Sequence, residues 1–561
     1  MRAVACLSLL VACLPIAPAM AQVKVLLADT IHTGDPAQPT AQAVAWQVAD
    51  GRIVAVGGRT QVLAAYPKAE QVRIEQGVVV PGLIDAHAHL TSLGNMLAQA
   101  DLWNARSKAE VVQRLQAFEK TLAPGEWLIG RGWDQNLWPE KTFPTAADLD
   151  AAFPQRPVYL ERVDGHAGWV NSAAMALAQS ASNTWARDWQ PQGGKIVRDA
   201  AGAPTGVLVD SAAALVHDYI PALDQTTREK RLEAALRESV RNGLTGVHDM
   251  GVSREELSLM KHLADQGRLP LRISAYADGN SHALEDLCRS GLYQHPGQRL
   301  QMRGVKLFID GALGSRGAAL LEDYSDDAHN RGLLVTSEAD LLTAVKKADG
   351  CGVQVASHAI GDRGNRLVLD TYAQVLGAQK SRDHRWRIEH AQVVALEDIP
   401  RFAPLGVIAS MQPTHATSDM GWAQDRVGPE RIQGAYAWQR LLHSGARLAL
   451  GSDFPVEQVD PRLGLYAAVT RQDRDGQPPG GWQPDQRLTA AEALRGFTSD
   501  AAWAGHDEAQ VGQLKVGLHA DFVVFDRDPL GVEPAALDDL KVQSTWVDGQ
   551  AVYTAGTASQ D

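Results

Sequence analysis

Two histidines near the start of this sequence have the spacing of a pair of metal ligands. His87 and His89 end an apolar run that begins at Val78. Alternate residues of a strand point to the same side, so both imidazoles leave the strand end together and can hold one metal ion. Four further candidate ligands lie downstream, each at the end of its own strand-like run: Lys306, His358, His390 and Asp453. The sequence therefore predicts one metal centre assembled from several strand ends.

Eight strand-like runs, separated by helical patterns, would position these side chains. One helical pattern starts at a capping box, Thr226 to Glu229, and continues with an apolar face that includes Leu232, Leu236 and Val240. Eight parallel strands close a (β/α)8 barrel, whose catalytic groups lie at the C-terminal strand ends. We therefore expect an α/β fold with a (β/α)8, TIM-like barrel. The runs cover residues 78–87, 244–249, 271–277, 304–310, 353–358, 387–390, 407–412 and 448–453.

The spacing of these runs predicts a divided chain. About 150 residues separate the first two runs, far more than a normal crossover. We interpret residues 95–225 as an insertion that caps the barrel mouth. Strand pairs joined by Asp-Gly, the strongest short hairpin signal, occur near both ends of the chain. Both termini are expected to build a small β-sandwich domain, residues 22–80 and 485–561, beside the barrel of residues 81–484.

Composition narrows the class of partner. The 561-residue chain has 45% hydrophobic and 21% charged residues, which is typical of a globular protein. Its net charge of -13 argues against nucleic acid and against docking on anionic membranes. No apolar run is long enough for a transmembrane segment. A small-molecule substrate is expected as the partner, and a homodimer stays open.

The first 21 residues are typical of an export signal. Arg2 precedes an apolar stretch, and Ala19-Met20-Ala21 forms a small-residue cleavage site. This predicts a periplasmic or secreted bacterial protein, with a lipid anchor at Cys13 as a minor alternative. The mature chain then keeps Cys288 and Cys351, which lie too far apart in sequence to predict a disulfide framework or a thiolate metal site.

The motifs around the candidate ligands resemble those of the amidohydrolase superfamily. Within it, the chain is similar to the YtcJ-like branch, which includes N-substituted formamide deformylases. The resemblance covers nearly all of the mature chain, and two stretches of the insertion share it, Gly132-Trp133-Asp134 and Asp164-Gly165-His166. The stretches that carry it in the barrel are residues 81–89, 305–316, 357–362, 387–392 and 451–455.

The resemblance implies a role for each candidate ligand. It makes His87 and His89 ligands of a first metal and His358 and His390 ligands of a second. Lys306 would bridge the two metals as an N-carboxylated lysine. A free lysine, with a pKa of about 10.4, is a cation and a poor ligand, whereas its carbamate is an anionic oxygen donor. If Lys306 stays an ammonium, one metal is expected.

The predicted reaction is hydrolysis of a carbon–nitrogen bond. Imidazole and oxygen ligands without thiolate suit Zn²⁺, with Mn²⁺, Fe²⁺, Co²⁺ or Ni²⁺ as alternatives. A hydroxide bound to one or two such ions would attack an amide, formamide or cyclic amide carbonyl. Asp453 would bind the first metal, take the proton as general base and pass it to the leaving nitrogen.

Four further residues are expected to contact the substrate. Trp133 and His166 belong to the insertion and would reach over the barrel mouth, or else pack inside the insertion. Arg316 would meet a substrate carboxylate, or else pair with Asp310 or Asp323. His415 follows the seventh strand and would line the pocket.

Two other functions stay open for this sequence. A lactonase or phosphoesterase would use the same site, because an activated water attacks those centres too. A non-catalytic exported protein that binds a metal or ligand is the alternative from another class, and the intact set of six ligands argues against it.

Overall fold

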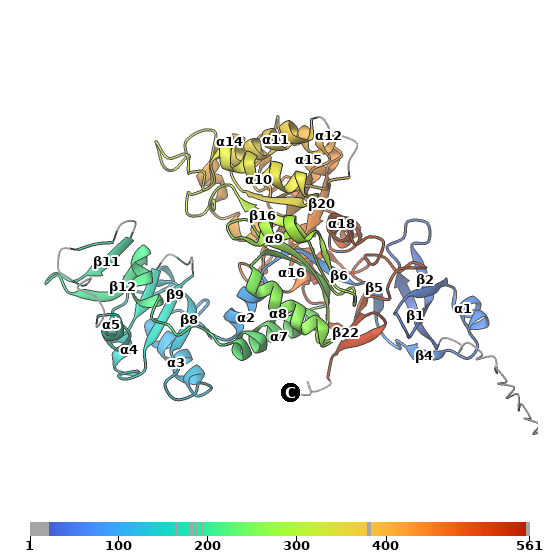
Figure 1. The fold of residues 1–561 in the computed structure, drawn as a ribbon, viewed down its shortest axis with the longest axis horizontal. Helices are drawn as coiled ribbons and strands as arrows, with labels where there is room; N and C mark the ends of the chain where they lie inside the picture. Colours follow the sequence, from blue (N-terminus) through green and yellow to red (C-terminus); the bar gives the residue numbers. More distant parts are fainter. Residues whose placement is uncertain are drawn as a thin grey trace, which may run out of the picture.

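A computed structural model of the chain describes residues 22–163, 165, 167–179, 185, 189–191, 194–377 and 383–556. Within these ranges the strands form three sheets, of eight, six and nine strands (Figure 1). No helix of the described residues is both long and apolar enough to cross a membrane. The predicted export signal, residues 1–21, lies outside the described residues.

The central sheet is the predicted barrel. Its eight main strands are parallel, each paired with the next along the chain, and β15 (Tyr293–Gln294) pairs with the outside of one of them. Every predicted run contains or overlaps one of these barrel strands, so the TIM-like α/β fold is confirmed. In sheet order the strands are β6 (Leu83–Ala88), β13 (Leu244–Val252), β14 (Arg272–Asp278), β16 (Leu300–Phe308), β17 (Gln354–Ala359), β18 (Arg387–His390), β19 (Ile408–Met411) and β20 (Arg447–Leu450).

Helices follow the barrel strands and cover their outer face (Figure 1). The N-cap of α7 is Asp224, whose side chain accepts a hydrogen bond from the Thr227 N–H. The predicted capping box at Thr226 is therefore wrong, because the aspartate two residues earlier starts the helix first. The helices are α2 (Leu90–Leu97), α7 (Gln225–Arg241), α8 (Arg254–Asp265), α9 (Ala283–Ser290), α10 (Glu338–Gly350), α11 (Asp362–Leu376), α12 (Phe402–Leu405), α13 (Pro413–Asp419), α14 (Ala423–Arg431), α15 (Trp438–His443), α16 (Pro461–Thr470), α17 (Ala490–Gly496) and α18 (Ser499–Ala504).

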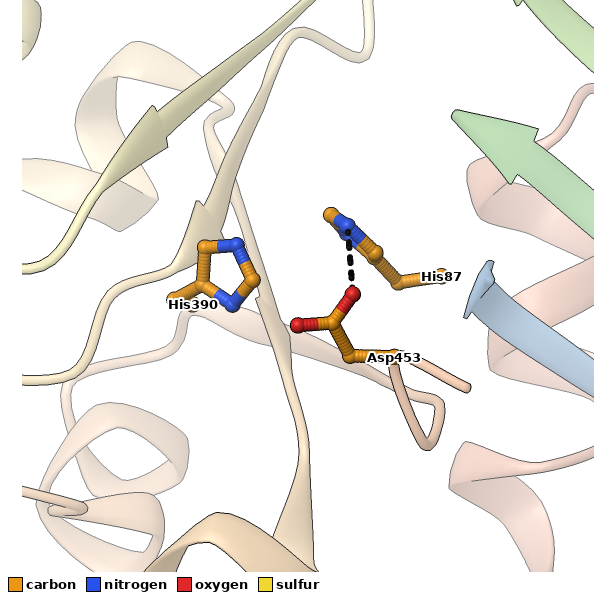
Figure 2. A group of neighbouring side chains, drawn as sticks. All are labelled: His87, His390 and Asp453. Atoms are coloured by element: carbon orange, nitrogen blue, oxygen red, sulfur yellow. Dashed lines mark ion pairs between the residues drawn. The ribbon is translucent and has the colours of Figure 1, made fainter. Parts of the chain in front are cut away.

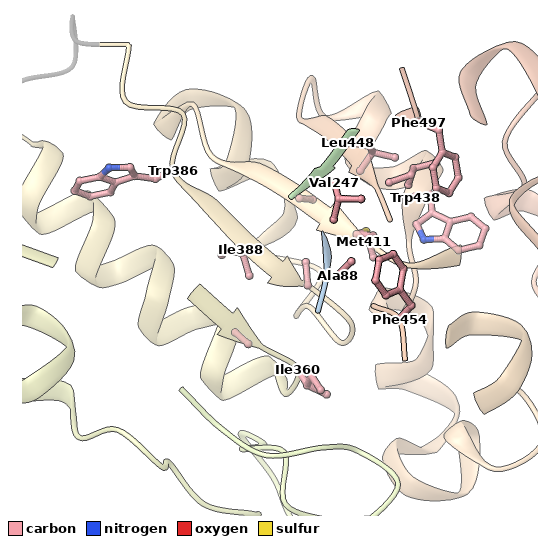
Figure 3. Close-up of a cluster of buried hydrophobic side chains, with 14 of the residues drawn as sticks. Ala88, Val247, Ile360, Trp386, Ile388, Met411, Trp438, Leu448, Phe454 and Phe497 are labelled. Carbon is pink, nitrogen blue, oxygen red and sulfur yellow. The ribbon is translucent and has the colours of Figure 1, made fainter. Parts of the chain in front are cut away.

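The main hydrophobic core lies between the barrel strands and these helices. Strand residues such as Ile388 and Leu448 pack against larger side chains, among them Trp386, Trp438 and Phe497 (Figure 3). All five are almost completely buried. The outer faces of the strands are therefore apolar, which leaves their inner faces and C-terminal ends for polar side chains.

The run 78–87, predicted as one strand, is two strands in different sheets. The strand β5 (Val78–Pro81) pairs with β21 (Phe522–Phe525) in the sheet built by the chain ends, and β6 belongs to the barrel. Gly82 stands between them, where an added Cβ would lie 2.1 Å from the Thr245 hydroxyl oxygen. The chain can change sheets here because a glycine lets the two backbones approach closely.

No strand ladder joins β20 and β6 in the described structure, and hydrogen bonds of the Asp85 side chain and of the backbone after β20 close the barrel there. The Asp85 carboxylate accepts hydrogen bonds from the Ser452 N–H and hydroxyl and from the His87 N–H. The Asp453 N–H donates to the His87 carbonyl at 2.7 Å. A Cβ on Gly451 would lie 2.5 Å from the Asp85 carboxylate, so only glycine fits this seam.

The insertion folds as a separate lobe around a six-stranded sheet with its own core. In Figure 1 the lobe stands out to one side of the barrel, joined to it at α2 and α7. Its apolar residues pack within the lobe, and the expectation that it caps the barrel mouth stays a prediction. Its elements are β7 (Ala100–Asp101), α3 (Lys108–Glu119), β8 (Leu128–Trp133), α4 (Ala146–Asp150), β9 (Val158–Arg162), β10 (Ala167–Val170), α5 (Ser172–Gln179), β11 (Gly194–Arg198), β12 (Pro204–Asp210) and α6 (Ala214–His217).

Both ends of the chain build the third sheet, as the hairpin signals predict. The two-layer sandwich and the exact domain limits stay predictions. An ion-pair cluster fastens this sheet to the barrel, with Arg272 of β14 donating to Asp521 and Asp548. The elements are β1 (Val23–His32), β2 (Thr40–Gln47), β3 (Ile53–Gly57), α1 (Arg59–Ala65), β4 (Glu70–Arg73), β5, β21 (Phe522–Phe525), β22 (Val542–Val547) and β23 (Gln550–Thr554).

Cys288 and Cys351 form a disulfide bond, contrary to the sequence-based expectation. The two residues are 63 apart in sequence, but Cys288 lies in the last turns of α9 and Cys351 is the C-cap of α10. Their Cα atoms are 5.1 Å apart. Distance along the chain misled the prediction because the barrel brings these helix ends together on its outer surface.

Candidate metal centre

The barrel brings the six predicted ligands to one place at the C-terminal ends of its strands. His87 lies on β6, Lys306 on β16, His358 on β17 and His390 on β18. His89 caps the start of α2, and Asp453 follows β20. Ligand atoms of His87, His390 and Asp453 all lie within 4.8 Å of one another, and Figure 2 shows the three side chains converging from different elements.

Short contacts connect the rest of the set to these three. His87 Nε2 lies 3.0 Å from Lys306 Nζ and 3.5 Å from Asp453 Oδ1. His89 Nε2 lies 3.1 Å from the same Asp453 oxygen. The His390 ring is 4.7 Å from the His87 ring and 4.6 Å from the His358 ring, between centroids. The His390 ring therefore lies close to both His87 and His358 rather than beside His358 alone.

Three of the imidazoles are oriented by a hydrogen bond from Nδ1. His87 Nδ1 lies 2.6 Å from Glu389 Oε2, His89 Nδ1 lies 2.8 Å from the Met250 carbonyl oxygen, and His390 Nδ1 lies 2.8 Å from the Gln412 side-chain oxygen. Each partner atom is an acceptor, so each Nδ1 carries the proton. The Nε2 atoms of His87 and His89 then face the centre of the site. This is the tautomer that a metal-binding histidine needs.

The backbone is strained at two of the candidate ligands. His390 has φ 72° and Asp453 has φ 63°, and the residue after His390, Ala391, has φ 41°. Residues other than glycine rarely adopt this left-handed region, and such strain gathers at functional sites. The surrounding hydrogen bonds hold both side chains toward the same point.

Burial keeps most of the imidazoles neutral. It lowers the pKa of His87 and His390 well below the usual value and that of His358 to about 3. Burial also opposes protonation of His89, but the hydrogen bond and charge of Asp453 outweigh it and raise the pKa of His89. Neutral imidazole is the form that binds a metal ion.

The anionic and cationic groups of the site are shifted as well. Burial alone would raise the pKa of the Asp453 carboxyl, but the surrounding histidines lower it well below its usual value. Burial lowers the pKa of Lys306 to about 8. Asp453 is therefore an ionised oxygen donor at neutral pH.

This donor set fits a divalent metal ion. It consists of buried imidazole nitrogens and a carboxylate, with no thiolate, which suits zinc and similar ions. The Nε2 atoms of His358 and His415 are buried and make no hydrogen bond to any described residue. Buried polar atoms normally have a partner, so these two nitrogens indicate a missing ligand.

Of the predicted substrate contacts, only His415 is found at the site. Its Nε2 lies 3.7 Å from Asp453 Oδ2, and its ring stacks 5.8 Å from that of His390. Arg316 instead pairs with Asp326 at 2.9 Å, rather than with either predicted aspartate. His166 lies outside the described residues.

Trp133 is part of the lobe core and does not reach the barrel mouth. Its side chain is completely buried, it packs against Trp138 and Trp169, and its indole N–H donates to the Leu160 carbonyl. The predicted substrate contact is therefore corrected. Its physical reason is that a tryptophan ending a strand of an independent sheet fills that sheet's own core.

Sequence reasoning missed the buried charges behind the ligands. Arg387 and Glu389 are both fully buried in β18, and Arg387 donates to both carboxylate oxygens of Glu389. The sequence carries a signal for them, because an arginine and a glutamate two residues apart in one strand share one face of it. Charged residues are almost never fully buried unless they are paired.

Comparison with known proteins decides the family. The model of the Amidohydrolase family matches residues 74–553. The chain belongs to the amidohydrolase family. It is 34% identical to the protein YtcJ of Bacillus subtilis, over 90% of this chain and 95% of that protein. It is 30% identical to the N-substituted formamide deformylase of Arthrobacter pascens, over 93% and 97% of the two chains.

A solved structure agrees with this membership. The crystal structure of an uncharacterized metal-dependent hydrolase from Pyrococcus horikoshii has a TM-score of 0.77 and 29% sequence identity, over 91% of this chain and 99% of that chain. The chain is therefore a hydrolase by family.

Proposed function

We propose that this protein is a metal-dependent hydrolase that cleaves a carbon–nitrogen bond of a small amide, formamide or cyclic amide. The observation that carries the proposal is the convergence of His87, His390 and Asp453 within 4.8 Å at the C-terminal strand ends. The 30% identity to an N-substituted formamide deformylase supports the bond type.

His87, His89, His358, His390 and Asp453 would hold one or two divalent ions, with Zn²⁺ as the expected metal. Such an ion lowers the pKa of a bound water and polarises the substrate carbonyl. Lys306 supports a two-metal site if it is carboxylated. Its side chain is buried with Nζ 3.0 Å from His87 Nε2, and its lowered pKa increases the share of neutral amine that reacts with CO₂, with loss of a proton.

Asp453 is the residue we assign to proton transfer. Its Oδ1 contacts His87 and His89, and its Oδ2 faces His415. The carboxylate would accept a proton from the attacking water and donate it to the leaving nitrogen, which leaves as a neutral amine. Its backbone N–H, which donates to the His87 carbonyl at 2.7 Å, fixes the point from which the side chain leaves.

His415 is the side chain we assign to the substrate. Its buried Nε2 makes no hydrogen bond to a described residue and lies 3.7 Å from Asp453 Oδ2. A hydrogen bond from this nitrogen to the substrate carbonyl or leaving group would orient the scissile bond beside the carboxylate. Arg316 lies in an ion pair with Asp326, so we assign it no substrate contact.

A substrate panel tests the proposed function. The protein is loaded with Zn²⁺ and assayed against N-formyl amines, N-acyl amines, cyclic amides, lactones and aryl phosphates. Hydrolysis of the nitrogen compounds at rates above those of the esters supports the proposal. Preference for lactones or phosphates would make it a lactonase or phosphoesterase. Metal binding without any hydrolysis would favour a binding protein.

Export from the cytoplasm is the second part of the proposal. The Cys288–Cys351 disulfide supports it, because disulfides persist mainly in oxidising compartments. Cell fractionation and N-terminal sequencing of the native protein test it. We expect a mature chain that begins at Gln22; a chain that keeps residues 1–21 and lies in the cytoplasm would contradict export.

A further inference from the structure

The candidate ligands differ in the charge of the group that orients them. The Nδ1 atoms of His89 and His390 donate to neutral oxygens, the Met250 carbonyl and the Gln412 amide. Of these three rings, His87 is the one whose Nδ1 donates to a carboxylate, that of Glu389, at 2.6 Å. A carboxylate is the stronger acceptor and makes the opposite nitrogen of the ring more basic.

Glu389 is held in place by Arg387. Its two oxygens accept from Arg387 Nε at 2.7 Å and Nη2 at 3.0 Å, and both side chains are completely buried. This bidentate pair fixes the position of the carboxylate and offsets the unfavourable burial of its charge.

The remaining donors of Arg387 are also used, which fixes the guanidinium across the barrel. They reach the Ala86 carbonyl on β6, the Ser410 hydroxyl on β19, the Tyr276 hydroxyl on β14 and His248 Nδ1 on β13. Ala86 precedes His87, so Arg387 ties Glu389 to the strand that carries the imidazole. Lysine has no planar fork and could not replace Arg387 here.

The oriented ring points at the other ligands. With Nδ1 donating to Glu389, His87 Nε2 carries no proton and faces Lys306 Nζ at 3.0 Å and Asp453 Oδ1 at 3.5 Å. Nε2 of His87 is thus presented to the metal position before any metal arrives.

We propose that Glu389, backed by Arg387, is a positioning residue that fixes the tautomer and raises the basicity of His87, and so sets the metal affinity of the centre. The inference rests on the proposed metal centre. This role differs from that of a purely structural ion pair. An ion pair that only stabilises the barrel would leave the metal affinity of the folded protein unchanged when Glu389 is replaced.

Metal titration of full-length variants tests the inference. The apo-protein is titrated with Zn²⁺ in competition with a chromophoric chelator, and folding is followed by circular dichroism. We expect Glu389→Gln, which keeps an acceptor oxygen but removes the charge, to bind Zn²⁺ about 10- to 100-fold more weakly. The matched control is Tyr276→Phe, which removes another partner of Arg387 at 3.0 Å and should keep wild-type affinity.

A second variant keeps the inference testable if Glu389→Gln does not fold. Glu389→Asp keeps the charge opposite Arg387 but withdraws the carboxylate from His87, and we expect it to weaken Zn²⁺ binding as well. Wild-type affinity in either folded Glu389 variant, or equal loss in Tyr276→Phe, would overturn the positioning role. A wild-type chain that binds no Zn²⁺ would instead contradict the metal centre, and this inference with it.

Discussion

Asp453 and His87, which are 366 positions apart in the sequence, are joined by a 2.7 Å hydrogen bond from the Asp453 N–H to the His87 carbonyl. This bond lies in the seam where the first and last barrel strands meet without a ladder. Closure of the barrel therefore also brings two candidate ligands together, because the seam carries one of them on each side.

The seam predicts that Asp85 matters for both stability and activity. Asp85→Ala would leave the buried N–H groups of Ser452 and His87 without their acceptor. We expect a loss of about 1–3 kcal/mol in the free energy of unfolding, measured in urea. A fall in kcat should accompany it, because Asp453 is next to Ser452. Full activity in Asp85→Ala would show that the seam does not position Asp453.

The cluster that joins the terminal sheet to the barrel predicts acid sensitivity. Burial would raise the pKa of Asp548, but His519, Arg272 and Arg299 outweigh it and lower this pKa. A carboxyl with a lowered pKa in the folded state stabilises the protein above its unfolded pKa of about 3.9, and this is lost as the pH falls through the folded pKa.

Asp548→Asn should therefore lower Tm at pH 7 and flatten the decline of Tm in acid. We expect a loss of about 2 kcal/mol at pH 7, typical of hydrogen bonds to charged groups. The exposed Asp475→Asn is the matched control and should follow the wild type. Parallel Tm profiles of Asp548→Asn and wild type from pH 3 to 7 would disprove the role of the cluster.

The disulfide predicts redox-dependent stability. It closes a loop of 63 residues between α9 and α10, and a chain-entropy argument gives up to about 4 kcal/mol of stabilisation. Replacing both cysteines by serine, or reducing the wild type, should lower Tm by the same amount. A reductant should have no effect on the double variant. An unchanged Tm after reduction would indicate that the bond adds no stability.

The buried position of Trp133 predicts a stability effect confined to the lobe. Trp133→Ala removes a side chain packed against Trp138 and Trp169, and such changes cost about 3–5 kcal/mol. Hydrogen exchange should accelerate in residues 128–133 and 158–162 but not in β16 to β18. Unchanged hydrogen exchange in the lobe, together with a raised KM, would instead indicate that Trp133 contacts the substrate.

The barrel was predictable because its signals are local. Most of the strands are short, largely apolar runs. Parallel strands in a barrel present their C-terminal ends on one face, so Lys306 and His358 lie on the same face whatever the conformation of the loops. The split of run 78–87 was not visible, because it depends on the approach of Gly82 to Thr245 from another strand.

The missed features depend on contacts between distant segments. The partners of Cys288 and Arg316 are chosen by loops and helix ends whose positions no local pattern specifies. The position of the lobe could not be predicted either, because its sequence favours a sheet of its own but does not specify where that sheet lies relative to the barrel. Glu389 is different, because Arg387 and Glu389 share one face of one strand, and their pairing could have been predicted from the sequence.

The most direct test of the account is metal content measured beside turnover in Asp453→Asn. Wild type and variant are loaded with Zn²⁺, analysed for bound metal under native conditions, and assayed on the best amide of the panel. We predict that the variant keeps much of its metal and loses turnover by about 10²-fold or more, typical of removing a general acid–base group. Near-normal turnover with full metal would contradict the account.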